Sequence, residues 1–231
     1  MSYFEKIFLE NISKDKIKTI FELGSRDLID AHALQKYYGA NVYSFECNPD
    51  CLIACENNFQ TFEHDVQSKI HLIKNAVSLN NGDIAFYPFE LKQYDNMGAS
   101  SLLKIDFNKR SIDDPDYGRV CPQKEIVVKG IRADTFMSEK NVLSVDLLCI
   151  DLQGYELNAL KSFGERLHDV KNIITECSIQ STYVGGATFM ELFEHLSQYG
   201  FEYCCSTRFG YEFPNMGLSG YTEFDALFVK T

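Results

Sequence analysis

The stretch Lys18–Ser25, with the sequence KTIFELGS, decides the fold of this chain of 231 residues. It is a run of apolar and β-branched residues with an acidic residue near its end and a glycine after it, which predicts a buried strand followed by a turn. Val42–Glu46, VYSFE, repeats this pattern further along the chain, and a helical pattern covers 28–39 between them. The sequence therefore predicts a βαβ unit whose strands end side by side.

The residues at these two strand ends are typical of a nucleoside site. Gly24 lets a ligand approach the backbone closely, because glycine has no side chain and tolerates tight turns. Glu46 ends the neighbouring strand, where a carboxylate can accept hydrogen bonds from both hydroxyls of a ribose. We therefore expect a nucleoside-containing ligand at this edge of the sheet.

Strand and helix patterns alternate along most of the chain. We expect strands near 18–24, 41–47, 70–78, 145–151 and 172–177, helices near 2–13, 28–39, 49–60, from 155 and at 188–199, and a final antiparallel pair at 201–207 and 223–230. Region 80–125 interrupts the alternation with turn residues and one short strand at 84–89. The prediction is a single doubly wound α/β domain over 1–231, with an N-terminal helical segment within 1–16 and an insertion at 80–125 that shapes a pocket.

Composition narrows the classes of partner. The formal net charge of −11 argues against binding to nucleic acid or to an anionic membrane, both of which need clustered Lys and Arg. The first residues lack a basic segment followed by an apolar run, and no apolar stretch is long enough to span a bilayer, so we expect a cytoplasmic protein. The eight cysteines lack metal-site spacing and are interpreted as reduced thiols.

Ligands of open α/β sheets bind outside the carboxyl ends of the strands. The polar residues that this rule selects are Glu22, Gly24, Ser25, Glu46, Asn75, Asp151 and Glu176. Any one of them could merely cap the following helix. Carboxylates at four successive strand ends favour a ligand instead, because clustered charge is costly without one.

The missing glycine motifs restrict the cofactor. No G-x-x-x-x-G-K-[ST] sequence is present, which argues against a P-loop nucleotide site. Gly24 is not followed by the further glycines that cradle a pyrophosphate, which argues against an NAD-dependent dehydrogenase. A cofactor with a nucleoside but no phosphates needs less glycine, and S-adenosylmethionine is such a cofactor.

Several segments together resemble one enzyme family. These are Glu22–Asp27, Phe45–Pro49, Asn75–Ser78, Gly98–Leu102, Ile150–Glu156 and Thr175–Glu176. In these segments the chain resembles the FkbM-type S-adenosylmethionine-dependent methyltransferases over roughly residues 17–205, and the Asp-x-x-Gly-x-Glu segment is the most specific part. The chain departs from the family at Leu28, where a second glycine is usual.

The resemblance implies a class I methyltransferase fold, a Rossmann-like sandwich with a seven-stranded, mostly parallel sheet of order 3-2-1-4-5-7-6 and helices on both faces. Glu22 and Gly24 would lie near the methionine and ribose, Glu46 would bind the ribose, and Asn75 and Ala76 would border adenine. The expected cofactor-binding residues are Glu22, Gly24, Ser25, Glu46, Asn75, Ala76, Ser101 and Asp151.

Asp151 and Glu176 are the expected catalytic residues, because the implied strand order makes their strands neighbours. One carboxylate could be a general base whose pKa the other raises. Alternatively, both could bind Mg²⁺ that acidifies an acceptor hydroxyl. The sequence leaves both mechanisms open.

The expected reaction is O-methylation of a small hydroxylated acceptor, most plausibly a sugar of a glycan or secondary metabolite. The aromatic loop 211–221 and Tyr183 are expected near the acceptor. The alternative is a noncatalytic Rossmann-like binding module that keeps the fold. The chain is expected to be a monomer or a homodimer, with no nucleic acid or membrane partner.

Overall fold

The computed structural model describes residues 3–90, 92, 94, 96–110, 112–120, 123–218 and 222–230. Its centre is a seven-stranded sheet. In spatial order the strands are β3 (Ile70–Ile73), β2 (Asn41–Phe45), β1 (Thr19–Leu23), β7 (Leu147–Ile150), β8 (Asn172–Ser178), β10 (Glu223–Lys230) and β9 (Phe201–Ser206). Counted within this sheet alone, the order is 3-2-1-4-5-7-6, so the expected topology is confirmed.

The strands from β3 to β8 are parallel, and β10 runs antiparallel to both of its neighbours. Leu23 pairs with Phe45 on one side and with Ile150 on the other. The loops that follow β1, β2 and β7 therefore leave the sheet at one edge. This edge is where ligands bind in open α/β sheets.

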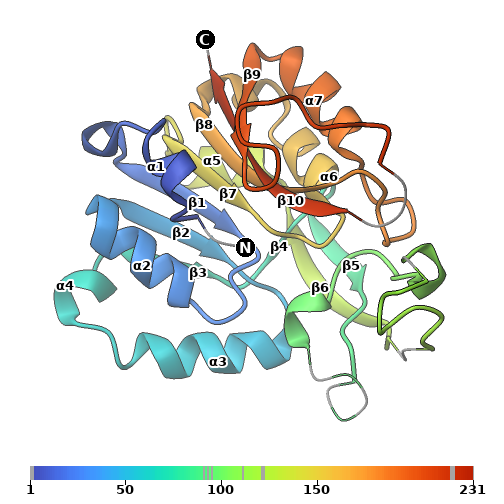
Figure 1. The fold of residues 1–231 in the computed structure, drawn as a ribbon. Helices are drawn as coiled ribbons and strands as arrows, with labels where there is room; N and C mark the ends of the chain where they lie inside the picture. The colour runs from blue at the N-terminus through green and yellow to red at the C-terminus, as the bar shows by residue number, and fades with distance from the viewer. Residues whose placement is uncertain are drawn as a thin grey trace.

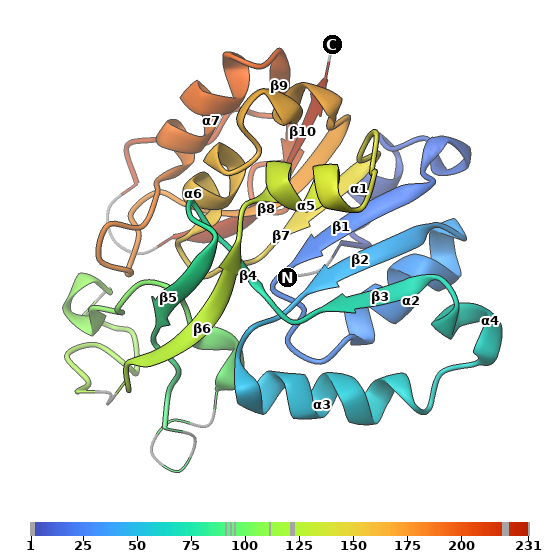
Figure 2. The ribbon, with the colours of Figure 1, turned by 180° about the vertical axis from the view of Figure 1, so that it is seen from behind.

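Helices cover both faces of this sheet (Figures 1 and 2). They are α1 (Lys6–Leu9), α2 (Ile29–Tyr38), α3 (Pro49–Phe59), α4 (His64–Gln67), α5 (Ala133–Glu139), α6 (Glu156–Lys161) and α7 (Phe189–Ser197), with short 3₁₀ turns at Lys14–Lys16, Met97–Ala99, Phe107–Lys109 and Gly164–Asp169. Phe8 and Leu34 belong to the core on one face, and Phe136, Leu160 and Phe189 to the core on the other. The sandwich with helices on both faces is as expected.

The N-terminal helix is much shorter than predicted. Only Lys6–Leu9 is α-helical, in place of residues 2–13, and a separate 3₁₀ turn follows. The Asn11 side chain donates a hydrogen bond to the carbonyl of Ile7 at 2.8 Å, and Ser13 has an extended backbone. Side chains of this kind compete with the helical hydrogen-bond ladder, which ends the helix early.

The predicted strand at 70–78 is two strands in two sheets. β3 ends at Ile73, and the chain turns there: the backbone amide of Asn75 donates a hydrogen bond to the carbonyl of Ile73 at 2.9 Å. β4 (Ala76–Val77) then joins a second sheet. That sheet has the order β4-β6-β5, with β5 (Gly82–Phe86) and β6 (Ile126–Ile131) antiparallel. It lies beyond the arrowheads of β1 and β2 (Figure 2). Neither β6 nor α5 was expected from the sequence.

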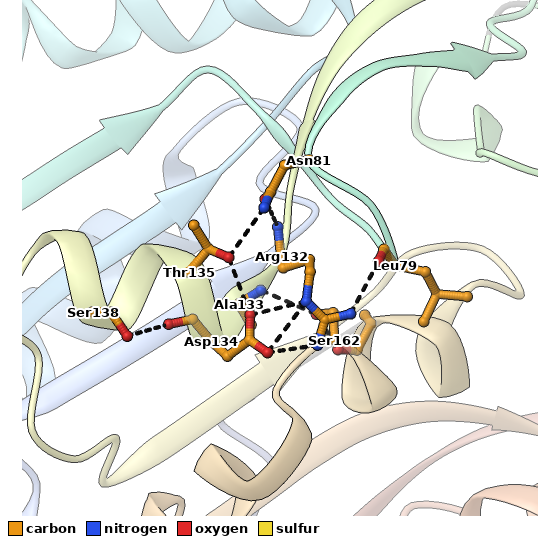
Figure 3. A network of polar contacts seen from close by, with 9 residues as sticks. Leu79, Asn81, Arg132, Ala133, Asp134, Thr135, Ser138 and Ser162 are labelled. Carbon is orange, nitrogen blue, oxygen red and sulfur yellow. Dashed lines mark hydrogen bonds and ion pairs between the residues drawn. The ribbon is translucent and has the colours of Figure 1, made fainter.

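A polar network joins the second sheet to the main domain (Figure 3). The backbone of Arg132 donates to the side chain of Asn81 at 2.8 Å, and its guanidinium donates to the carbonyl of Leu79 at 3.0 Å. The backbone of Ala133 donates to the Ser162 hydroxyl at 3.2 Å. These contacts fix the chain between β6 and α5 against the turn after α6, and so fix the second sheet beside the strand ends.

Within the described part of the chain, no helix has both the length and the apolar character needed to cross a membrane.

Candidate active site

An open cavity lies at the carboxyl ends of β1, β2 and β7. Residues from these strand ends, the start of α3, β4 and the insertion form its wall. The lining residues are Gly24, Arg26, Phe45, Glu46, Cys47, Asn48, Cys51, Asn75, Ala76, Val77, Phe86, Met97, Gly98, Ser100, Ser101, Leu102, Asp151, Leu152 and Tyr155. Six residues expected at the cofactor line it: Gly24, Glu46, Asn75, Ala76, Ser101 and Asp151.

Gly24 forms the tightest backbone contact of the cavity. Its φ is +90°, and a Cβ placed there would lie 1.9 Å from the backbone oxygen of Asp151. The amides of Gly24 and Ser25 both donate to the carbonyl of Phe45, at 3.0 and 3.1 Å. Only glycine fits between the two strand ends, because any side chain would push β1 away from β7.

Three backbone amides, from the turn after β1 and from the residues before α3, donate hydrogen bonds to the carboxylate of Glu46. One carboxylate oxygen accepts from the amides of Cys47 and Asn48, each at 2.7 Å, and the other accepts from the amide of Arg26 at 2.8 Å. Burial raises the pKa of Glu46, and these three bonds oppose the rise. The oxygen that faces Arg26 has further acceptor capacity for a ligand hydroxyl.

Glu22 and Ser25 do not line the cavity. Glu22 shares the face of β1 with Ile20, because residues two apart in a strand point the same way. There it accepts a hydrogen bond from the Ser44 hydroxyl, and burial raises its pKa to about 8. The Ser25 hydroxyl accepts from the amide of Leu28 at 3.2 Å. Both residues thus support the turn below the cavity wall.

Leu28 occupies a conformation that favours glycine. Its φ of +66° and ψ of 3° are left-handed, and it precedes the first residue of α2. Its side chain is fully buried in the core beneath that helix. The chain therefore keeps the turn geometry with a leucine, and packing of the side chain compensates for the strained backbone.

The insertion contributes one wall of the cavity through Ser101. Its hydroxyl donates to the carbonyl of Leu152 at 3.1 Å and accepts from the amide of Leu103 at 3.1 Å. Ser101 is buried, which fixes the insertion against the loop that follows Asp151. Asn75, on the opposite wall, donates to the carbonyl of Lys129 at 3.4 Å.

Asp151 and Glu176 are bridged by one amide. The Nε2 of Gln153 donates to Asp151 Oδ1 at 2.7 Å and to Glu176 Oε2 at 3.0 Å. The Tyr183 hydroxyl lies 2.9 Å from Gln153 Oε1, which fixes the orientation of the amide. Burial raises the pKa of Asp151, and burial together with Asp151 raises that of Glu176 well above its ordinary value.

This arrangement gives no support for the Mg²⁺ alternative that the sequence left open. The group between the two carboxylates is an N–H donor, and a metal ion needs lone pairs there. No group of three or more His, Cys, Asp or Glu side chains among the described residues is placed to hold a metal ion.

The model of the methyltransferase FkbM domain matches residues 24–203. The chain belongs to this family. The match begins at the glycine of the first turn and extends through β8 and α7 into β9, so it contains both walls of the cavity.

Two curated relatives are similar to this chain in sequence. One is the 2-O-methyltransferase NoeI of Sinorhizobium fredii, which is 29% identical over 72% of this chain and 65% of its own length. The other is the hexuronic acid methyltransferase AglP of Haloferax volcanii, which is 23% identical over 74% of this chain and 59% of its own. The chain thus spans less than two thirds of either relative.

Among solved structures, magnesium protoporphyrin IX methyltransferase (ChlM) from Synechocystis PCC 6803, with bound SAM, resembles the FkbM domain in fold. The TM-score is 0.50 at 8% identity, over 97% of this chain and 74% of that one. The fold is therefore that of the class I methyltransferases.

Two residues of this FkbM domain's site were missed by sequence reasoning. Arg26 is the one cation among the described residues that line the cavity, and Gln153 forms the bridge between the carboxylates. Gln153 has a φ of +54°, and Arg26 has a φ of +59°. Side-chain positions after such turns are not encoded in hydrophobic periodicity, so only the position of Gln153 inside Asp-x-x-Gly-x-Glu could have pointed to it.

The aromatic loop expected at the acceptor is placed differently. Phe213 packs against Phe189 and Phe193 with ring centroids 5.2 and 5.1 Å apart, on the side of α7. Tyr211 lies 3.2 Å from the side chain of Asn11. Residues 219–221 of this loop lie outside the described residues. Tyr183, which was also expected near the acceptor, does reach the candidate site, through its contact with Gln153.

Proposed function

We propose that this FkbM domain is an S-adenosylmethionine-dependent O-methyltransferase. The observation that carries the proposal is the cavity wall formed by Gly24 against Asp151 and by Glu46 on its three amides. A glycine turn beside a fixed carboxylate suits a nucleoside that has no phosphates. The alternative, a noncatalytic binding module, would leave the buried carboxylate pair at the acceptor side without a role.

The cavity lining fits the parts of the cofactor. Glu46 suits the ribose hydroxyls, and the apolar surfaces of Ala76 and Phe86 suit the adenine ring. Arg26 offers a positive charge for the carboxylate of the methionine part. The cofactor supplies an electrophilic methyl group when it is bound.

The acceptor hydroxyl must lose its proton during transfer. Asp151 lies on the cavity wall and is the general base in our proposal. Gln153 holds the Asp151 carboxylate in place, and Glu176 is linked to Asp151 through the same amide. The raised pKa of Asp151 makes its carboxylate a stronger base than an exposed aspartate.

The acceptor in this proposal is the hydroxyl of a sugar. Two relatives are named a 2-O-methyltransferase and a hexuronic acid methyltransferase, and both names fit a carbohydrate substrate. The insertion at 80–125, which lines the cavity through Phe86 and residues 97–102, would shape the space in which the cofactor meets this acceptor.

Calorimetric titration of S-adenosylhomocysteine into the protein, with Mg²⁺ and with EDTA, tests the cofactor site. We expect micromolar binding in both buffers. Glu46→Ala removes charged hydrogen bonds to the ribose, so the Kd should rise about 100-fold. Glu56→Ala is the matched control, because it removes one negative charge from an exposed position of α3. Absence of binding to the unaltered protein would favour the noncatalytic module.

A further inference from the structure

A second, small pocket lies on the other side of the carboxylate bridge. Its wall comes from the loop before α6, the end of β8 with the loop that follows, and the first residue of β10. The lining residues are Gly154, Glu156, Glu176, Cys177, Ser178, Ser181, Thr182, Tyr183 and Glu223. Glu176 belongs to this pocket and Asp151 to the cofactor cavity, so the Gln153 amide connects the two spaces.

The wall of this pocket has an excess of negative charge. None of Glu156, Glu176 and Glu223 forms an ion pair within the described ranges of the chain. Glu156 accepts from the amides of Leu152 and Gly154 through one oxygen only, at 2.9 and 3.1 Å. The charge of Arg110 lowers the pKa of Glu223, but the Arg110 guanidinium already pairs with Asp114 and Asp116, at 3.3 Å each.

Burial and mutual repulsion act on these carboxyl groups. Burial raises the pKa of Glu156 to about 7, and burial together with Asp151 raises that of Glu223 to about 7. Carboxyl groups in such a cluster either bind protons or require a cation. The raised pKa values mean that these carboxyl groups hold protons near neutral pH in the empty pocket, and a bound cation would take the place of those protons.

A separate observation indicates a missing ligand. Thr182 lines the pocket and is fully buried, yet its hydroxyl has no hydrogen-bond partner in the described structure. Buried hydroxyls almost always have a partner, so an unpaired one needs an explanation. A ligand with N–H donors would satisfy the hydroxyl oxygen and the glutamates together.

We propose that this pocket binds a protonated primary amine of the acceptor, which makes the acceptor an amino sugar. The inference rests on the proposed function and names its substrate class. An ammonium group carries one positive charge and three N–H donors. It is small, and its donors could bond the carboxylate oxygens and the Thr182 hydroxyl that line this pocket. A hydroxyl brings no charge, and a uronate carboxylate would be repelled.

The bridge sets a suitable distance between the two ends of the acceptor. Because Asp151 Oδ1 and Glu176 Oε2 accept from the same nitrogen, they lie within about 6 Å of each other. A single sugar ring spans such a distance. For an amine at Glu176 and a hydroxyl of the same ring at Asp151, the base of the proposed reaction, the Gln153 amide that lies between the two carboxylates would have to move aside.

The test measures binding of D-glucosamine, D-galactosamine and D-mannosamine to the protein saturated with S-adenosylhomocysteine, beside their N-acetyl forms and D-glucuronate. We expect at least one amino sugar to bind 10-fold or more tightly than its N-acetyl form. Glu223→Gln should abolish this preference, whereas Glu202→Gln, at an exposed position of β9, should keep it. The affinity for S-adenosylhomocysteine should be the same in both variants, which shows that they fold.

Thr182→Val separates a binding role from a structural one. It removes the unpaired hydroxyl at nearly constant volume, so the melting temperature should stay or rise while the amino-sugar preference falls. Equal binding of amino and N-acetyl sugars, or no binding of any amino sugar, overturns the inference. Binding of Mg²⁺ that is lost in Glu223→Gln would also overturn the inference, because the pocket would then be a metal site. If S-adenosylhomocysteine itself fails to bind, the proposed function fails first.

Discussion

The buried carboxylates of the candidate site have different hydrogen-bond partners on its two sides: the proposed cofactor side around Glu46, and the proposed acceptor side around Asp151 and Glu176. On the cofactor side, Glu46 accepts three backbone N–H bonds and has a fixed position before any ligand arrives. On the acceptor side, Asp151 and Glu176 share one side-chain amide, and Glu223 has no ion pair among the residues that the structure describes. The first arrangement suits a neutral diol, and the second requires a proton or a cation.

Removing the proposed base, Asp151, should have the largest effect. Asp151→Asn keeps the shape of the side chain but cannot take up the hydroxyl proton, so kcat should fall by about 10²- to 10⁴-fold. Steady-state methyl transfer, with S-adenosylhomocysteine affinity measured in parallel, checks this. Asp146→Asn is the control at the other end of the same strand. Asp146 accepts from the backbone of Lys18 and Thr19, so this change should lower stability and spare kcat. Equal kcat in Asp151→Asn and the unaltered protein would contradict the assignment.

On the cofactor side, the backbone itself can be altered at Gly24. Gly24→Ala should weaken S-adenosylhomocysteine binding by about 100-fold or more, because the new Cβ forces β1 and β7 apart and displacements near 1 Å cost this much. Gly39→Ala is the matched control, with a similar positive φ of +68° but open space around the Cβ. It should lower the melting temperature and leave the affinity unchanged. A similar loss of affinity in both variants would mean that backbone strain, and not contact, is the cause.

The smallest expected effect concerns Glu22, below the cofactor side. Its folded-state pKa of about 8 exceeds the ordinary value of 4.5, so the folded state favours the protonated carboxyl. Its contribution to stability is therefore full below about pH 4.5 and is lost as the pH rises through 8. Glu22→Gln mimics the protonated form and removes this loss. Between pH 5 and 8 the variant should gain on the order of 1–3 kcal/mol relative to the unaltered protein in urea unfolding. A constant difference across this pH range would show that Glu22 is ionised in the folded state.

The sequence predicted much of the lining of the cavity, but not the bridge between Asp151 and Glu176. Glu46 could be found because it ends an apolar strand one βαβ unit after Gly24, and parallel strands place such ends together. Glu22 belongs to the same segment, but the two-residue period of β1 turns it away from the cavity. On the acceptor side, the bridge by Gln153 depends on a left-handed turn that no periodic pattern records.

Two elements show how tertiary contacts override local patterns. The stretch 70–78 was predicted as one strand, yet Asn75 turns the chain, and β4 pairs with β6 in the second sheet. A helix was expected near 2–13, but only Lys6–Leu9 is helical, and Tyr3 and Phe8 are buried in the core. Each choice buries apolar surface that a longer regular element would leave exposed.

The sequence by itself determined the alternation of strands and helices, the sheet order through its family pattern, and the meeting of Gly24, Glu46 and Asp151 at one edge. Periodic burial and the geometry of parallel strands are local rules that the chain carries in every segment. Only the tertiary structure decided which carboxylates reach a cavity, which amide joins Asp151 to Glu176, and which glutamates share a pocket with Thr182. Those contacts join residues from distant segments through left-handed turns, and their charges become costly only when the fold excludes water from around them.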